Sequence, residues 1–265
     1  MRKIFIILGL ALCILFGTIS PALADPHNGW SQTNTPIVEI GQNAYIELLF
    51  GNHSDDHTSY RIDRNWRMED SVVKVITPSG ETMDITDRFF YMGELAEVDE
   101  ERIGVNNYYA GSFQTKEQGA YIIAAEGNFT YGDQEKPTLR SAKSFVATSK
   151  VPTLKKAKKI KNFDKQVTPE RAELIPLFNP AAVTPGTEVS AQLLLKGEPV
   201  SGVEVAVIRR SDSSDIRMQT DQEGKITWQT GEADYYLVRA EIKAENHQKD
   251  DQDYEATMTF FVQNK

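Results

Sequence analysis

The short stretch His53-Ser54-Asp55-Asp56-His57 holds two histidines and two aspartates. Imidazole nitrogen and carboxylate oxygen are both ligands for Zn²⁺, Ni²⁺ and Co²⁺. His53 and His57 would supply nitrogens, while Asp55 or Asp56 would add an oxygen or orient an imidazole. The stretch is therefore a candidate site for a divalent transition-metal ion.

The spacing of the two histidines also matches the zinc-protease motif, in which both lie on one face of a helix. Here Ser54 takes the place of the glutamate that would act as general base. The preceding run is strand-like and ends in Gly51-Asn52, so we expect His53 and His57 to lie in a loop. The residues do not predict a metalloprotease.

Two histidines are too few for a tight, closed site, and His27 is the candidate for a third ligand. It lies close to the expected start of the mature chain, on a segment free to fold back. Pro26 has no amide hydrogen, so the amino-terminal copper–nickel arrangement cannot form. A terminal histidine without any role remains the alternative.

The sequence gives little support for other kinds of metal, catalytic or phosphate-binding site. The fourth histidine, His247, stands beside Asp250 and Asp251 in what we expect to be a solvated loop between strands. The acidic run 94–101 lacks the ligand spacing of a calcium loop. The sequence contains neither a nucleophile elbow nor a glycine-rich loop that opens a helix. We therefore expect a protein that is not an enzyme.

Aromatic residues offer a second route to function. Exposed rings on a sheet face would bind a glycan or a protein, whereas buried rings would belong to the core. The residues in question are Trp30, Trp66, Phe89, Phe90, Tyr91, Tyr108 and Tyr109. We favour the core, and keep a non-enzymatic binding or adhesion module as the alternative function.

The first 24 residues have the pattern of a secretory signal peptide. Arg2 and Lys3 precede an apolar run over 4–16, and Ala22-Leu23-Ala24 suits signal peptidase. The run is shorter than the ~20 residues that cross a bilayer. We expect cleavage after Ala24 and a secreted or periplasmic protein. The single cysteine, Cys13, would leave with the signal, so disulfides and thiolate sites are not expected.

Loss of Arg2 and Lys3 with the signal would change the formal net charge from −9 to −11. Binding to nucleic acid requires clustered lysine and arginine, so we do not expect a nucleic-acid partner. An acidic surface is compatible with attraction of cations, although acidity also serves solubility.

The elements that must position these residues are predicted to be strands. Residues 25–148 contain strand-like runs at 44–50, 71–81 and 142–148, and the runs 108–115 and 119–131 flank a short connection as in a hairpin. No helical stripe is sustained over ten residues. This half is predicted to be a β-sandwich that carries the metal site.

Residues 149–167 are predicted to be a basic linker. They are rich in lysine, namely Lys150, Lys155, Lys156, Lys158, Lys159, Lys161 and Lys165. Like charges keep a segment extended, which favours a linker. Contact of Lys155 to Lys161 with anionic lipid headgroups is the less favoured alternative.

Residues 168–265 are predicted to form a second β-sandwich. Strand-like runs occur at 172–180, 188–210, 234–244 and 254–263, and 216–230 has the pattern of a hairpin. The whole chain is therefore expected to be all-β, with two Ig-like sandwich domains in tandem after the signal.

The second half also has a proline-flanked entry strand, then Lys196-Gly197-Glu198-Pro199, a paired strand, and Thr220-Asp221 three residues before Gly224. With these motifs the chain resembles a family of secreted bacterial proteins of unknown function. Its members are associated with cobalt/nickel ECF-type ABC uptake systems as extracytoplasmic (NikK-like) components. The same half is similar to carboxypeptidase-regulatory and transthyretin-like sandwiches, which specify a fold rather than a function.

The resemblance extends to the first half and covers most of residues 25–263. His27 and Trp30 follow the signal, Gly51 and His53 end a strand, and YYAGSF precedes QGAYIIAA. The resemblance implies a metal-binding accessory that presents Ni²⁺ or Co²⁺ near a membrane-embedded transporter, with Zn²⁺ or Cu²⁺ as alternatives. It implies His27, His53 and His57 as ligands. Asp25-Pro26 precede His27 here, where family members often start closer to the histidine.

Overall fold

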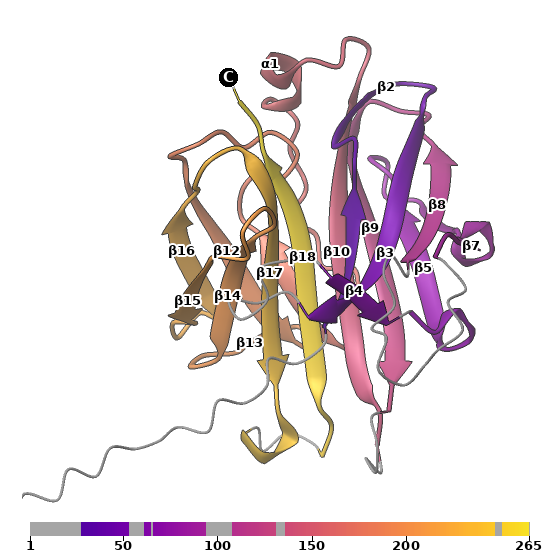
Figure 1. Ribbon diagram of the computed structural model, residues 1–265. Coiled ribbons are helices and arrows are strands. Elements are labelled where there is room, and N and C mark those ends of the chain that lie inside the picture. Colours follow the sequence, from indigo (N-terminus) through magenta and orange to yellow (C-terminus); the bar gives the residue numbers. More distant parts are fainter. Residues whose placement is uncertain are drawn as a thin grey trace, which may run out of the picture.

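The computed structural model describes residues 28–52, 61–64, 66–93, 108–130, 136–246 and 251–264, and their regular secondary structure is nearly all β (Figure 1). The all-β prediction is confirmed. The strands form three sheets of five, nine and four strands. The short helix α1 (Leu154–Ala157) and three 3₁₀ turns (Met68–Asp70, Thr86–Arg88 and Ala244–Asn246) complete the described elements. None of the helices in these ranges is long and apolar enough to cross a membrane.

The five-stranded sheet is built around β3, and all its members come from the first half of the chain. Its strands are β1 (Asn28–Thr33), β3 (Asn43–Asn52), β4 (Arg61–Arg64), β7 (Phe90–Tyr91) and β8 (Tyr108–Gln114). The four-stranded sheet comes from the second half. It contains β11 (Ala172–Pro176), β12 (Glu188–Leu195), β13 (Glu198–Pro199) and β16 (Lys225–Gln229).

The nine-stranded sheet joins the two halves of the chain. From the first half it takes β2 (Ile37–Glu39), β5 (Ser71–Ile76), β6 (Thr82–Asp84), β9 (Gly119–Phe129) and β10 (Thr138–Ser149). From the second half it takes β14 (Glu204–Arg209), β15 (Asp215–Gln219), β17 (Asp234–Ile242) and β18 (Tyr254–Val262).

The junction between the halves is the parallel pair β10–β18, in which Leu139 lies opposite Tyr254 and Lys143 opposite Met258. Figure 1 shows these two long strands side by side at the centre of the molecule. The predicted division into 25–148 and 168–265 therefore runs through one hydrogen-bonded sheet. Whether each half counts as an Ig-like unit of its own stays a prediction.

Every residue of strand β10 is buried except Leu139, which is half-buried. A strand buried on both faces must be covered by a layer on each side. One layer is β1, and the other is β11 of the four-stranded sheet, and both contact β10. Strand β12 belongs to an outer layer, and its residues alternate accordingly between buried and more exposed.

The apolar core also crosses the boundary between the halves. One cluster unites Ile122 and Phe145 of the first half with Leu193, Val238 and Phe260 of the second. A second cluster, with Ile46, Leu48 and Trp66 among its members, fills the space between the five-stranded sheet and the nine-stranded one.

The predicted hairpin over 108–131 is wrong. Strand β8 pairs with β3, whereas β9 pairs with β5 and β10, so the connection between them passes from one sheet to another. The Tyr121 hydroxyl holds this connection, because it accepts hydrogen bonds from the amides of Lys116 and Glu117, both at 2.9 Å. A short connection with glycine suits such an arch as well as it suits a hairpin.

The predicted hairpin over 216–230 is wrong for the same reason. Strand β15 pairs with β14 and strand β16 pairs with β12, in different sheets. The turn expected around Gly197 is present, since Leu195 pairs with Glu198. Lys196 and Gly197 have positive φ values of 50° and 84°, a conformation that suits a tight two-residue turn.

Residues 149–167 differ from a solvated extended linker. Helix α1 begins after Thr153, whose hydroxyl accepts a hydrogen bond from the Lys156 amide. Ala157 and Phe163 are buried, and the Phe163 ring packs edge-to-face on Phe145. The prediction of a linker is based on the lysines of the segment, whereas the apolar residues between them attach it to the core.

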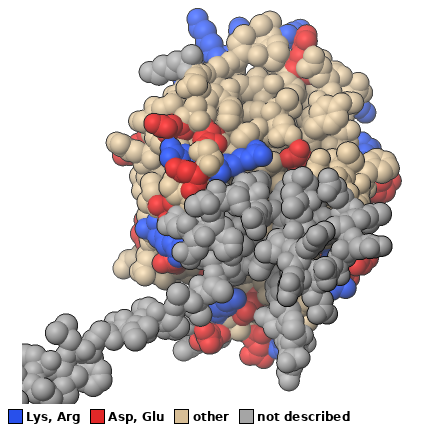
Figure 2. All heavy atoms as spheres, in the orientation of Figure 1, with Lys and Arg blue, Asp and Glu red and all other residues tan. Residues whose placement is uncertain are grey.

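On the face shown in Figure 2, acidic and basic side chains are interspersed.

Candidate metal centre

All the candidate ligands, His27, His53, Asp55, Asp56 and His57, lie outside the described residues. The same holds for His247. The structure does describe Asn28, which follows His27, and it describes Asn52 and Arg61, which stand before and after the segment 53–60.

Strands β1 and β3 bring two of those points together. Strand β1 begins at Asn28, directly after His27, and β3 ends at Asn52, directly before His53. The strands are antiparallel, and Asn28 lies opposite Gly51. The beginning of one strand is therefore beside the end of the other, at a single corner of the five-stranded sheet.

Strand β4 begins at Arg61, directly after the segment 53–60, at the same corner of the sheet. Asn52, the last residue of β3, pairs with Arg61, the first of β4. The segment 53–60 thus leaves and re-enters the sheet at one ladder pair. Strands β1 and β4 both pair with Phe50 and Gly51, so they occupy opposite edges of β3.

The beginning of β1 is fixed by contacts with the second half of the chain. The buried Asn28 side chain donates from Nδ2 to Glu241 Oε1 at 3.1 Å and accepts from the Arg239 guanidinium at 2.7 Å. The Gly29 amide donates to Glu255 Oε1 at 2.9 Å. All six residues of β1 are buried. The residue that follows His27 is therefore held in place by several polar contacts.

A buried ion pair holds Glu255, the side chain that accepts the hydrogen bond from the Gly29 amide. Arg140 of β10 donates to Glu255 Oε2 at 2.8 Å, and each side chain is 2% exposed. The Arg140 guanidinium also lies over Phe50 and Phe129, at 4.4 and 4.6 Å from the ring centroids. Burial raises the pKa of the Glu255 carboxyl above its ordinary value, although the positive charge of Arg140 opposes the shift.

Glu241 is a polar residue of this region that the sequence did not single out. Besides the contact with Asn28, its carboxylate lies 3.4 Å from Lys243 Nζ, which is also 3.4 Å from Asp253. Burial disfavours the charged lysine, but the two carboxylates raise the pKa of Lys243. Asn28 and Glu241 are 213 positions apart, so no spacing in the sequence connects them.

The described residues alone do not assemble a metal centre. Within those ranges, no group of three or more His, Cys, Asp or Glu side chains could hold an ion. The oxygens of Glu241 and Glu255 are engaged with Asn28, Lys243, Arg140 and the Gly29 amide. These carboxylates can position the amino-terminal segment, and the predicted ligands themselves would have to come from 27 and 53–57.

Close packing leaves no space at Gly29. A methyl group there would meet Trp66 Cζ2 at 2.9 Å and the Phe50 ring at 3.3 Å. The Trp66 indole is fixed in turn by a hydrogen bond of 2.7 Å to the Leu49 carbonyl. Glycine at this position lets β1 lie directly against these rings.

The aromatic residues of the first half divide between core and surface. Trp30, Trp66 and Phe89 are buried, as the core interpretation expects. Phe90 is 69% exposed, and the half-buried Tyr91 and Tyr109 rings meet edge-to-face at 5.5 Å. A binding platform would have to be built from this smaller group, without the tryptophans.

Comparison with known proteins identifies a family but no activity. The family model described as a domain of unknown function (DUF4198) matches residues 24–244. No curated protein matches the chain.

Among solved structures, a DUF4785 family protein from Legionella pneumophila is 11% identical, with a TM-score of 0.29 over 79% of this chain and 51% of that one. A bacterial ice-binding adhesin is 10% identical, with a TM-score of 0.26 over 90% of this chain and 64% of that one. Alpha-2-macroglobulin from Escherichia coli is 11% identical, with a TM-score of 0.26 over 90% of this chain and 20% of that one. The chain spans less than two thirds of the length of these structures.

Proposed function

Because this chain belongs to the DUF4198 family, a domain family of unknown function, we propose its function from its own residues and from the resemblance that its sequence motifs carry. It is an extracytoplasmic protein that binds a divalent transition-metal ion, Ni²⁺ or Co²⁺, as a non-catalytic accessory of an ECF-type uptake transporter. His27, His53 and His57 bind the ion, and Asp55 or Asp56 adds an oxygen or orients an imidazole.

The observation that carries the proposal is the register of β1, β3 and β4. Asn28 lies opposite Gly51, and Asn52 lies opposite Arg61. His27 is one residue beyond the first pair, and His53 is one residue beyond the second. Ladder partners are about 5.5 Å apart or less and successive Cα atoms 3.8 Å apart, so chain length limits the separation of these two histidine Cα atoms to about 17 Å.

The anchoring of β1 supports the same proposal. A ligand on a free terminus must lose much conformational freedom when it binds an ion. His27 is bonded to Asn28, which is already buried and hydrogen-bonded to Glu241 and Arg239. The cost of ordering that histidine is correspondingly reduced, which favours it as the third ligand.

The proposed role beside a transporter rests on the resemblance of the sequence motifs to the secreted family associated with ECF-type uptake systems. A cation-binding protein outside the membrane would need a signal peptide, and residues 1–24 have that pattern. The acidic net charge would favour encounter with a cation. Transfer to the membrane partner would need a site that releases its ion, and a set of three imidazoles with an open position allows this.

Isothermal titration of the chain without residues 1–24 with NiCl₂ and CoCl₂ tests the proposal. We expect a dissociation constant in the micromolar range or below for the unaltered protein, and loss of at least a hundredfold in affinity for His53→Ala/His57→Ala. His247→Ala is the matched control, since it removes an imidazole outside the proposed site, and it should bind as the unaltered protein does. Equal binding by the double variant would rule out this site.

A non-enzymatic module that binds a glycan or a protein is the second candidate function. The exposed Phe90, beside Tyr91 and Tyr109, is the observation in its favour. Glycan-array binding that is lost in Phe90→Ser, together with unaltered metal titrations in His53→Ala/His57→Ala, would favour this candidate over the first.

A further inference from the structure

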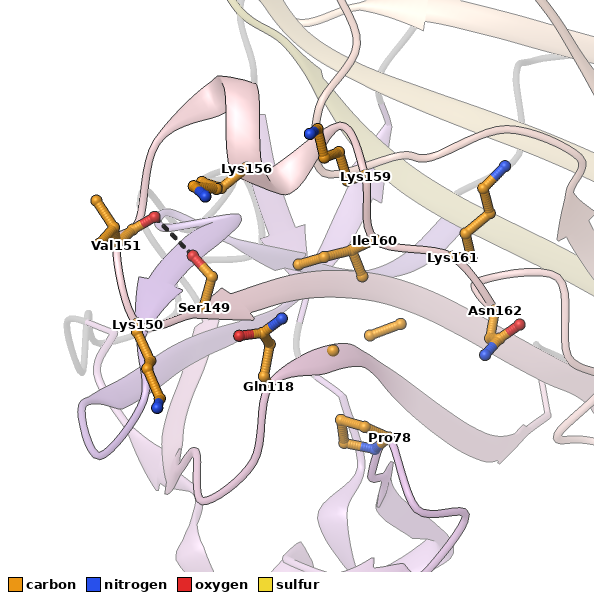
Figure 3. A pocket seen from close by; sticks show the side chains of 12 residues that line it. Pro78, Gln118, Ser149, Lys150, Val151, Lys156, Lys159, Ile160, Lys161 and Asn162 are labelled. Carbon is orange, nitrogen blue, oxygen red and sulfur yellow. Dashed lines mark hydrogen bonds between the residues drawn. The ribbon is translucent and has the colours of Figure 1, made fainter.

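A cavity of about 560 Å³ lies where β10 ends and β9 begins, under the segment that carries helix α1 (Figure 3). Four lysines contribute to its lining, namely Lys150, Lys156, Lys159 and Lys161. Figure 3 shows them spaced around the cavity, with Gln118 and Ile160 between them and Pro78 below. The four lysines are exposed, and the lining of the cavity is therefore rich in lysine and partly apolar.

The charge of this cavity differs from that of the protein as a whole. The chain has a formal net charge of −9, yet none of the described residues that line the cavity is an aspartate or a glutamate. Within the described residues, none of the four lysines forms an ion pair. Four like charges around one concavity repel each other, and an anion between them would relieve the repulsion.

The segment that carries the lysines is held against the core. Asn179 Nδ2 donates to the Ala157 carbonyl at 2.8 Å and to the Ile160 carbonyl at 3.0 Å. Phe163 is buried and packs on Phe145. The lysine backbones are thus fixed before any ligand arrives, which lowers the entropic cost of binding.

The base of the cavity is also shaped by the backbone. Gly119 has a φ of +141°, which a residue with a side chain rarely adopts. A methyl group there would meet Pro78 Cβ at 2.7 Å. At the other side, the Ser149 hydroxyl donates to the Val151 carbonyl at 2.7 Å and holds the turn that carries Lys150.

We propose that this cavity binds a small polyanion that carries at least two phosphate groups. Lysine ammonium groups are compact, strongly hydrated point charges that suit phosphate oxygens, whereas planar carboxylates are bound more specifically by the arginine fork. The volume admits a drug-sized ligand rather than a single ion. The amides of Gln118 and Asn162 add donors for the bridging or hydroxyl oxygens of such a ligand.

Phosphate groups of this kind occur on soluble molecules and on lipid headgroups. A flat, exposed row of lysines would suit a membrane surface. Here four lysines line a concavity, while Lys155 does not line it and Lys158 lines only an adjoining cavity of about 410 Å³, which shares Ile160, Lys161 and Asn162 with the first. The geometry favours a ligand that enters the cavity, and the experiment below separates the two sources.

The test uses the chain without residues 1–24 and sodium tripolyphosphate as the probe, by isothermal titration at low salt without added metal. The unaltered protein should bind, and Lys156→Gln/Lys159→Gln should lower the affinity at least tenfold. Lys155→Gln/Lys158→Gln is the matched control, because it removes the same charge from the same segment outside this cavity. It should change the affinity less than threefold.

Three results would overturn the proposal: no binding by the unaltered protein, equal losses in the two double variants, or binding to anionic vesicles that tripolyphosphate does not compete away. Binding to vesicles that contain 30% phosphatidylinositol phosphate, if tripolyphosphate displaces it, would support the cavity with a headgroup as the source. Tripolyphosphate binding without vesicle binding would support it with a soluble source. His53→Ala/His57→Ala should leave the titration unchanged, so this test stands apart from that of the metal site.

Discussion

Asn28 lies directly opposite Gly51 in the ladder between β1 and β3, while its side chain bonds to Glu241 and Arg239 of the second half. One residue therefore connects the amino-terminal strand, the end of β3 and the central sheet. The candidate ligand His27 precedes it directly, and the candidate segment 53–57 begins two residues after its partner. The contacts of Asn28 are thus the clearest means to test whether this corner of the sheet supports a metal site.

Replacement of Asn28 by alanine should weaken both folding and metal binding. The change removes one buried and one partly buried hydrogen bond to charged side chains, which predicts a loss of about 1–3 kcal/mol in the free energy of unfolding. Because β1 would be less firmly held, we expect nickel affinity to fall about tenfold, in line with the loss of other supporting contacts around metal ligands. Urea denaturation and nickel titration measure the two effects.

Asn179→Ala is the matched comparison. It removes the two hydrogen bonds that a partly buried asparagine donates to the lysine segment, together with the one that it accepts from the Ala181 amide. We expect a similar loss of stability, weaker tripolyphosphate binding and unchanged nickel affinity. If the two asparagine variants lost nickel affinity equally, general destabilisation would explain the result and Asn28 would have no special role.

Gly29→Ala should destabilise the protein through overpacking. Its new methyl group would lie 2.9 Å from the Trp66 ring, whose indole is fixed by the Leu49 carbonyl. Such insertions cost about 1–3 kcal/mol, since neighbouring side chains must leave their preferred positions. Thermal unfolding followed by tryptophan fluorescence would report both the loss and the displaced ring. An unchanged midpoint would contradict the close packing of β1.

Arg140→Met should leave the Glu255 carboxylate buried without its charged partner, while the methionine retains much of the contact with Phe50 and Phe129. Removal of one member of a buried pair costs about 3–5 kcal/mol at neutral pH. Urea denaturation at pH 7 measures the loss. In the combined variant Arg140→Met/Glu255→Gln neither member of this pair carries a charge, so much of the loss should be recovered.

The pH dependence of these variants follows from Glu255. Burial already raises its pKa above the ordinary value of 4.5, and loss of Arg140 would raise it further. A carboxyl whose pKa is higher in the folded state contributes stability that is present below 4.5 and is lost as the pH rises through the folded value. The deficit of Arg140→Met should therefore be small near pH 4.5 and grow towards pH 7. A deficit that shrinks as the pH rises would refute this account.

Much of the strand content could be predicted from the sequence, because alternation of apolar and polar residues is a local signal. The run 44–50 became β3, and 254–263 became β18. The partners of the strands could not be predicted in the same way. A short turn between β8 and β9 is compatible with a hairpin or an arch, and the pairing of β10 with β18 joins residues about 115 positions apart.

The burial of charged residues could not be predicted from the sequence either. Arg140 and Lys143 occur in a strand whose polar residues would normally face water, yet both are buried and paired with Glu255 and Glu173. Their burial follows from the layers on both sides of β10, a property of the whole fold. For the candidate site, the sequence supplied the ligand types, and only the strand register brought the beginning of β1 beside the end of β3.

X-ray absorption spectroscopy of the nickel-loaded chain without residues 1–24 tests most directly whether the two chain segments share one ion. The outer-shell scattering of imidazole counts the bound histidines. We predict three in the unaltered protein, two in His27→Ala and one in His53→Ala/His57→Ala, with no change in His247→Ala. An imidazole count that is the same in His27→Ala as in the unaltered protein would contradict the shared site.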